Sequence, residues 1–191
     1  IGFTFANGTG SLPEYVHQGV FDQFLLSPRN LYLRIVSSEL RVSAIGDCLF
    51  GLILLAIYVV RAGLDWDQIM MLFFFLPPAI LLFINIALIT SLVAFLIPDS
   101  AVLSKNLFEL FFAPSMYPAS LYQNSVRVVF LFVIPSLVIG GIPIEAIRDH
   151  RWMLVILLWA ISAAWFVGTL KLLRYAIRRY ESGNLTGARV T

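Results

Sequence analysis

The longest uncharged stretch of the sequence sets the class of fold. No Asp, Glu, Lys or Arg occurs from Gln68 to Pro98, whereas a helix needs only about 20 apolar residues to cross the hydrocarbon core of a bilayer. The extra length allows tilt or extension past the membrane, and we expect Pro77-Pro78 to kink the helix. The chain is 60% hydrophobic and 13% charged, against about 45–50% and about 25% in soluble domains. The sequence therefore predicts an integral membrane protein.

Other apolar runs extend this prediction to an all-α, polytopic helix bundle. Residues 1–41 are expected to form a cytoplasmic segment with a lead-in helix, and residues 42–191 a transmembrane domain with a basic C-terminal tail. The polar stretch that follows Pro98 is expected to be an interfacial helix and a turn. The four expected spans are residues 42–60, 69–97, 127–144 and 152–172.

The third expected span carries residues that interrupt helices, namely Pro135, Gly140, Gly141 and Pro143. Broken backbone at membrane depth is tolerated only where protein covers it or where it lines a cavity. We therefore expect a bent or re-entrant outer end. The four residues are candidates for a transport pathway or a gate, and a packing notch is the alternative.

The distribution of basic residues predicts the orientation. If the region around Pro28 is cytoplasmic, ten basic residues lie on the cytoplasmic side and three outside, as the positive-inside rule requires. An even number of spans also places both ends of the chain in the cytoplasm, as expected for a multi-pass protein of the plasma (inner) membrane of a bacterium. The cytoplasmic set is Arg29, Arg34, Arg41, Lys105, Arg127, Lys171, Arg174, Arg178, Arg179 and Arg189; the outer set is Arg61, Arg148 and Arg151.

An amphipathic stretch precedes the first span. Residues 7–11 are typical of a turn-rich loop, and Ser11 with Glu14 forms the pattern of a capping box. We expect a helix from Leu12 to Leu26 with a weak point at Gly19, ended by Pro28. At helical spacing its apolar face consists of Val20, Phe21, Phe24 and Leu25.

Motifs for nucleotide or metal chemistry are missing from the sequence. It contains no phosphate-binding loop of the form G-x-x-x-x-G-K-[ST], no H-E-x-x-H and no G-x-S-x-G. The two histidines, His17 and His150, are expected on opposite sides of the membrane, and Cys48 is the single cysteine. We therefore predict no catalytic residues, no metal and no cofactor bound by this chain, and no nucleic-acid partner.

Two polar side chains fall within the expected spans. Asp47 lies close to the expected cytoplasmic boundary, where a wetted or paired carboxylate is the simpler interpretation. Asn85 lies deep in the second span. It is a candidate for lining a pathway, although a hydrogen bond that bridges helices is the commoner role of such a residue.

Several short motifs together resemble the ABC-2 type permeases once grouped as a family of unknown function. The stretch from His17 to Pro28 is similar to the pattern G-x-x-D-x-x-L-L-R-P of that family, although Ser27 replaces its usual basic residue. The resemblance covers nearly the whole chain, and the order and spacing of the motifs make it specific. The matching residues are Gly19, Asp22, Leu25, Leu26 and Pro28, followed by Tyr117-Pro118, Ile134-Pro135, Ile142-Pro143 and the ending from Arg179 to Gly183.

The resemblance implies a permease half with six membrane helices, of which the first two would precede Ile1. It implies dimerisation with itself or a second permease, contact with membrane lipids, and docking onto a separate ABC ATPase that uses ATP and Mg. The stretch Leu12–Leu26 takes the place of the coupling helix. We expect the coupling residues to be Gly19, Phe21, Asp22, Phe24, Leu25, Leu26 and Pro28. From the apolar face we expect Phe21, Phe24 and Leu25 to be the exposed anchors that seat in a groove of the ATPase.

Two functions remain open. One is the permease subunit of an exporter for an amphipathic or hydrophobic substrate; the alternative is a non-transporting membrane scaffold or assembly protein. A neighbouring gene for an ATPase with a phosphate-binding loop would favour the exporter. A secondary transporter fits less well, because inverted repeats and mid-membrane charges are not visible.

Overall fold

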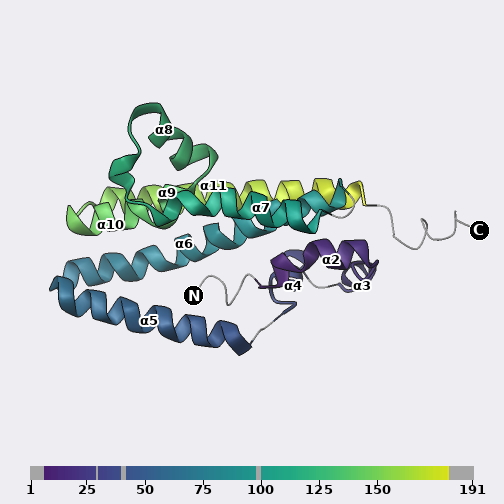
Figure 1. The fold of residues 1–191 in the computed structure, drawn as a ribbon, viewed down its shortest axis with the longest axis horizontal. Coiled ribbons are helices and arrows are strands. Elements are labelled where there is room, and N and C mark those ends of the chain that lie inside the picture. The colour runs from purple at the N-terminus through teal and green to yellow at the C-terminus, as the bar shows by residue number, and fades with distance from the viewer. Residues whose placement is uncertain (1–6, 29, 40–41, 98–99, 181–191) are drawn as a thin grey trace, which may run out of the picture.

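Figure 1 shows the fold in a computed structural model. The model describes residues 7–28, 30–39, 42–97 and 100–180. Within these ranges the chain forms helices, turns and loops and no strand, which confirms the expected all-α class. The expectations that concern Arg29, Arg41 and Arg189 lie outside the described residues.

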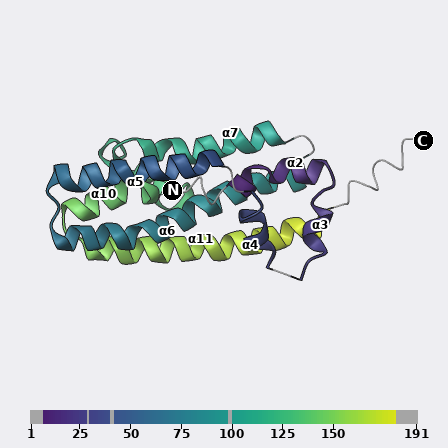
Figure 2. The ribbon, with the colours of Figure 1, turned by 90° about the horizontal axis from the view of Figure 1, so that it is seen from below.

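Among the described residues, three helices are long and apolar enough to cross a membrane. They are α5 (Val42–Ala62), α6 (Trp66–Ser91, prolonged by the 3-10 turn η1, Leu92–Phe95) and α11 (Trp152–Arg178). A capping box starts α6, because the backbone N–H of Asp65 donates to Gln68 Oε1 at 3.0 Å. Helices α6 and α11 pack side by side over much of their length (Figures 1 and 2).

Helix α6 runs through Pro77-Pro78 without interruption because α11 replaces the lost backbone donor. Pro78 has no N–H for the carbonyl of Phe74, four residues earlier. Trp159 Nε1 on α11 donates to that carbonyl at 3.2 Å, and Ser162 Oγ donates to the carbonyl of Pro78 at 2.9 Å. Side chains of a neighbouring helix commonly satisfy the backbone around an intramembrane proline in this way.

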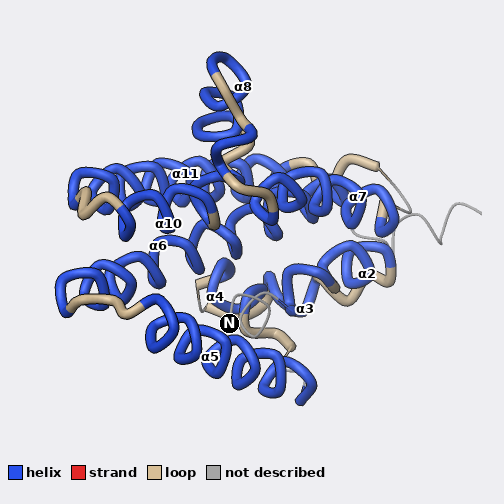
Figure 3. Tube along the Cα trace, turned by 60° about the vertical axis from the view of Figure 1, so that its left-hand side comes forward, coloured by secondary structure: helices blue, strands red, loops and turns tan. Residues whose placement is uncertain are grey.

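Helix α5 lies apart from this pair. It diverges from the bundle in Figure 3, and Ala44 is its one buried residue. Asp47 is exposed near the beginning of the helix, and its position at the membrane interface stays a prediction. Most apolar side chains of α5 therefore face the surroundings, as on a helix in contact with lipid or with another membrane segment.

The third expected span is a chain of short helices. Residues 127–144 do not form one membrane-crossing helix: Arg127 and Glu145, expected at opposite ends of that span, form an ion pair. The intervening chain folds back on itself, and α8 projects from the bundle (Figures 1 and 3). The pieces are α7 (Ala101–Phe112), the 3-10 turns η2 (Ala113–Met116) and η3 (Ala119–Leu121), α8 (Asn124–Val128), the π-helical turn η4 (Val129–Val133), α9 (Ser136–Ile139) and α10 (Gly141–Arg148).

Two of these pieces cover α6 where a full span was expected. Helix α7, expected to lie at the interface, packs along α6 with the ring of Phe83 edge-on to Phe108 and Phe112, each at 5.4 Å. Helix α10 covers the half of α6 nearer the α5–α6 turn (Figure 2). The number of membrane crossings and the orientation of the chain stay predictions.

The segment before α5 is folded more tightly than the sequence predicts. Residues 7–10 are helical instead of forming a loop, and Ser11 makes no side-chain cap. The single expected helix is divided into α2 (Leu12–His17) and α3 (Asp22–Leu25), because Gly19 adopts a φ of +71° that favours glycine. Helix α4 (Leu31–Val36) follows, capped by the Asn30 side chain.

The two larger of the three buried clusters among the described residues join helices at opposite ends of the bundle. The first joins α2, α3 and α4 to the last turns of α6 and α11. The second joins α6, α9, α10 and the first half of α11 at the opposite end. The short helices are therefore part of the same core as two membrane-length helices.

Candidate coupling site

Phe21 joins the short helices to the bundle. Its side chain is 0% exposed and its ring meets Phe95 edge-on at 4.9 Å and Tyr180 edge-on at 5.2 Å. Phe95 ends the α6–η1 helix and Tyr180 follows α11. The expectation that Phe21 is an exposed docking anchor is therefore wrong in this structure, because the side chain faces inward.

Phe24 is half-buried and holds α3 against α4. The guanidinium of Arg34 lies over its ring at 5.1 Å and donates to the backbone carbonyls of Gln23 and Phe24 at 2.9 and 2.8 Å. The ring also packs on Tyr15 at 5.5 Å. Phe24 thus serves the internal packing of the segment and presents only part of its surface.

The outward apolar surface of the segment is smaller than expected. Leu25 is 43% exposed and Leu26 is 85% exposed, whereas Gly19 and Asp22 are half-buried and Pro28 is exposed. Two of the predicted coupling residues are therefore large apolar groups free to contact another protein. Whether they contact an ATPase stays a prediction.

A second inward contact comes from α4. Tyr32 is buried, its hydroxyl donates to Asn85 Oδ1 at 3.2 Å, and its ring meets Phe166 of α11 edge-on at 5.2 Å. Burial raises the pKa of Tyr32 to about 12, so the hydroxyl stays a neutral donor near pH 7. Asn85 therefore bridges α6 to α4, and a bridge between helices is the role that sequence reasoning favoured for it.

A hydrogen bond to a carboxylate joins α2 to the residues that follow α4. The hydroxyl of Tyr15 on α2 donates to Glu39 Oε1 at 2.6 Å, and this bond raises the pKa of Tyr15. Close packing adds to it, because a Cβ built on Gly8 would lie 2.1 Å from the carbonyl oxygen of Ile35. These contacts join α2 to the residues after α4, and the helical turn before α2 to α4, without involving the membrane-length helices.

The four candidates for a gate, Pro135, Gly140, Gly141 and Pro143, lie at the beginnings of α9 and α10. A Cβ on Gly140 would lie 2.5 Å from the carbonyl oxygen of Ser115, and one on Gly141 would lie 2.7 Å from Ala119 Cβ. Pro135 precedes α9, and Pro143 lies in the first turn of α10, where its missing N–H is harmless. The two glycines therefore let Ser115 and Ala119 pack closely against them, as a packing notch would, and a role in a gate stays a prediction.

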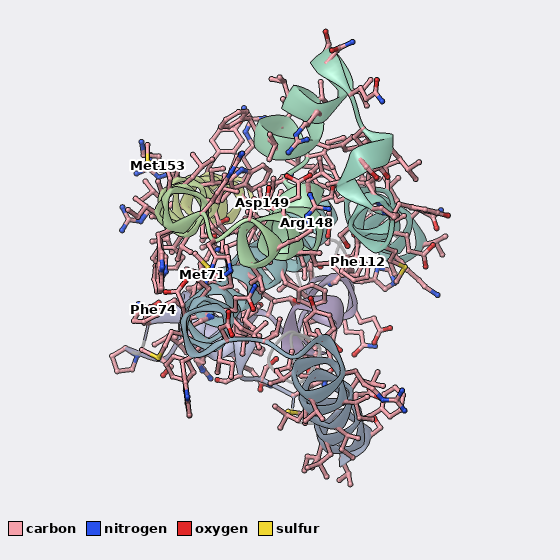
Figure 4. The ribbon with its side chains drawn as sticks, turned by 90° about the vertical axis from the view of Figure 1, so that its left-hand side faces the viewer. Met71, Phe74, Phe112, Arg148, Asp149 and Met153 are labelled. Atoms are coloured by element: carbon pink, nitrogen blue, oxygen red, sulfur yellow. The ribbon has the colours of Figure 1, made fainter. Side chains whose placement is uncertain are left out.

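The opposite end of the bundle carries a polar cluster that the sequence did not reveal. Asp67 accepts from Trp152 Nε1 at 3.0 Å and lies 3.2 Å from His150 Nδ1, while Gln68 Nε2 donates to the Ile147 carbonyl at 2.9 Å. In Figure 4, which faces this end, Arg148 and Asp149 mark the link to α11; their side chains form an ion pair at 3.1 Å. The cluster ties the start of α6 to the start of α11.

Sequence reasoning missed the residues that receive the coupling segment. Phe95 and Tyr32 match no motif, and Tyr180 lies in the family-like ending from Arg179 to Gly183, which did not indicate a contact with this segment. A weak signal was available for Tyr32, since a polar aromatic side chain and a deep asparagine are natural partners in an apolar core. Phe95 and Tyr180 carry no such signal.

Membrane-length helices packed on a short-helix segment at one end define a polytopic membrane domain of the permease type. The chain belongs to the ABC-2 family of transporter proteins: a family model described as ABC-2 family transporter protein matches residues 1–184. Members of this family are membrane proteins that generally partner with an ABC ATPase. No curated protein and no solved structure matches the chain.

Proposed function

We propose that this chain is the permease subunit of an ABC-2 exporter in the plasma (inner) membrane. A separate ABC ATPase subunit hydrolyses ATP with Mg, and the segment α2–α4 receives the resulting movement. The single observation that carries the proposal is the burial of Phe21 between Phe95 and Tyr180. This contact gives a push on the short helices a direct route into two membrane-length helices.

The route avoids α5, although α5 is the helix that follows the segment in sequence. Leu12, Phe21 and Ile35 share a buried cluster with Leu88 of α6 and Leu173 of α11. A close-packed core transmits displacement because it has few voids to absorb it. We infer that ATP hydrolysis moves α6 and α11 together, and that α5 follows through its turn into α6.

The docking face is proposed to centre on Leu25 and Leu26. Interface energy concentrates in a few large side chains that become buried in the complex, and these two leucines are the exposed apolar residues of the predicted coupling set. Arg34 fixes the backbone directly before them, so the face is pre-ordered. The proposed complex contains a second permease copy or a related one, with both chain ends in the cytoplasm and an amphipathic or hydrophobic substrate.

The proposal is tested by purifying the permease with its ATPase from native membranes. Leu26→Ala is expected to weaken ATPase retention by about 1–2 kcal/mol, the range of a moderate interface contact. Leu96→Ala is the matched control, because Leu96 is also exposed (58%) and lies at the same end of the bundle, outside the segment. Equal retention by both variants would remove the docking face from the account. A chain that co-purifies with no ATP-hydrolysing subunit would favour the scaffold function.

A further inference from the structure

The described part of the chain contains a cavity of about 490 Å³ between its first helical turns, α6 and α7. Cavities of about 300–1,000 Å³ are typical of small-ligand sites. Neither Leu25 nor Leu26, the leucines of the proposed docking face, lines this cavity. Its lining residues are Asn7, Thr9, Gly10, Glu14, Phe83, Ala87, Thr90, Ser91, Ala101, Val102, Ser104, Lys105 and Phe108.

Two polar groups of the lining have no hydrogen-bond partner. Ser104 is 4% exposed, and neither its hydroxyl nor the side-chain amide nitrogen of Asn7 is paired in the described structure. A buried polar group left unpaired is costly and calls for a ligand or water. Both groups are able to donate to an anion.

The charges around the cavity are of both signs. Lys105 contributes an ammonium group from α7, and Ala101 and Val102 belong to the first turn of that helix, where the helix dipole favours negative charge. Glu14 contributes a carboxylate from α2, and no ion pair joins it to Lys105. The lining therefore offers one place for an anion and one for a cation.

Two hydroxyl oxygens of α6 add to the part of the lining that suits a cation. Thr90 Oγ1 and Ser91 Oγ already donate to carbonyls of their own helix, at 3.1 and 2.8 Å from the Ala87 oxygen. Each oxygen keeps a lone pair and acts toward a ligand as an acceptor. The remaining wall is apolar and includes the rings of Phe83 and Phe108.

We propose that this cavity binds the headgroup of a phospholipid that carries a primary ammonium group. The phosphodiester lies against Lys105, Ser104 and Asn7, and the ammonium group lies against Glu14 and the hydroxyl oxygens of α6. The apolar wall covers the glycerol and the start of the acyl chains. Because the site needs no nucleotide and no ATPase, it stands apart from the proposed coupling function.

The test is equilibrium binding of acyl-chain-labelled lipids to the complete permease in detergent without nucleotide. Phosphatidylethanolamine is expected to bind about tenfold more tightly than phosphatidylcholine, whose ammonium group has no N–H to donate, and than phosphatidylglycerol, which has no cation. A factor of this size corresponds to one charge-assisted hydrogen bond. Equal affinity for the three lipids would overturn the proposal.

Two variants with matched controls locate the site. Lys105→Gln is expected to weaken all three lipids about tenfold, whereas Lys171→Gln, at the other lysine of the chain, leaves them unchanged. Glu14→Gln is expected to remove the preference for phosphatidylethanolamine over phosphatidylcholine, and Glu109→Gln on the exposed side of α7 to keep it. Equal losses with both lysine variants, or a preference that survives Glu14→Gln, would refute the site.

A soluble competitor separates a lipid from a small phosphate compound. O-phosphoethanolamine carries both charges but none of the apolar part. It is expected to displace phosphatidylethanolamine only at concentrations at least about a hundredfold higher, because it lacks the acyl carbons whose burial strengthens binding of the lipid. Displacement at equal concentration would show that the site takes a soluble phosphate ester, and the lipid assignment would fall.

Discussion

Replacement of Phe21 by alanine tests how the short helices are joined to the membrane helices. The side chain is fully buried and its ring has aromatic partners at 4.9, 5.2 and 5.9 Å, all within the range in which ring pairs attract. Removal of a buried phenyl ring costs about 3–5 kcal/mol in other cores. Phe95 ends the α6–η1 helix and Tyr180 follows α11, and both helices are held by many other contacts. Most of this loss therefore falls on the attachment of α2 and α3.

The assay is hydrogen exchange of the amides of α2 and α3 in the purified permease. A loss of about 4 kcal/mol corresponds to roughly a thousandfold larger open population, at 1.4 kcal/mol per factor of ten. When the amides exchange from the open form, the exchange rate rises in proportion to the population of that form, by the same factor. The amides of α6 near Phe83 report on the bundle and are expected to keep their protection.

Phe24→Ala is the matched control for Phe21→Ala. Phe24 is half-buried and packs on Tyr15 and Arg34 within the segment, so its removal is expected to speed exchange by about tenfold only. In the complex, Phe21→Ala is expected to retain the ATPase and to hydrolyse ATP without transport, since Leu25 and Leu26 are untouched. If α2 and α3 exchange no faster in Phe21→Ala than in Phe24→Ala, the aromatic contact does not carry the attachment and the coupling route is refuted.

Three further outcomes are expected. Tyr32→Phe leaves the buried Asn85 oxygen without its donor at 3.2 Å and lowers the free energy of unfolding by about 1–3 kcal/mol; an unchanged melting temperature would contradict the bridge. Gly140→Ala places a Cβ 2.5 Å from a carbonyl oxygen and costs about 1–3 kcal/mol, whereas Gly168→Ala meets open space and is expected to stabilise helix α11 by up to about 1 kcal/mol. In a cysteine-free background Asp65→Cys is expected to react only with a thiol reagent applied outside the cell. Labelling from the cytoplasm would contradict the predicted orientation.

Much of the candidate site was predictable because local patterns encode it. The run from Gln68 to Pro98 carries no charge, and this property of composition needs no tertiary information to indicate a membrane helix. The motif from Gly19 to Pro28 marked the short-helix segment for which coupling is predicted, and that role stays a prediction. Gly19 was also a correct indication of a weak point, since its positive φ ends α2.

Helical periodicity failed at Phe21, which was placed on the docking face. Phe21, Phe24 and Leu25 do share a face in one continuous helix, but the break at Gly19 and the packing of the chain turn Phe21 inward and leave Leu25 outward. Periodicity identifies an apolar face without saying whether the bundle or a partner protein covers it. The rings that cover Phe21 are 74 and 159 residues away, at Phe95 and Tyr180.

The sequence by itself determined the all-α membrane class, the family, the positions of the three long helices and the breaks between residues 127 and 144. Each of these follows from composition or from side chains close together in the chain. Only the tertiary structure decided that Arg127 and Glu145 meet, that α7 and α10 cover α6, and that Asn85 reaches Tyr32. These outcomes depend on which apolar surfaces fit each other in space, and the hydrophobic effect that drives burial is non-directional and does not specify the partner.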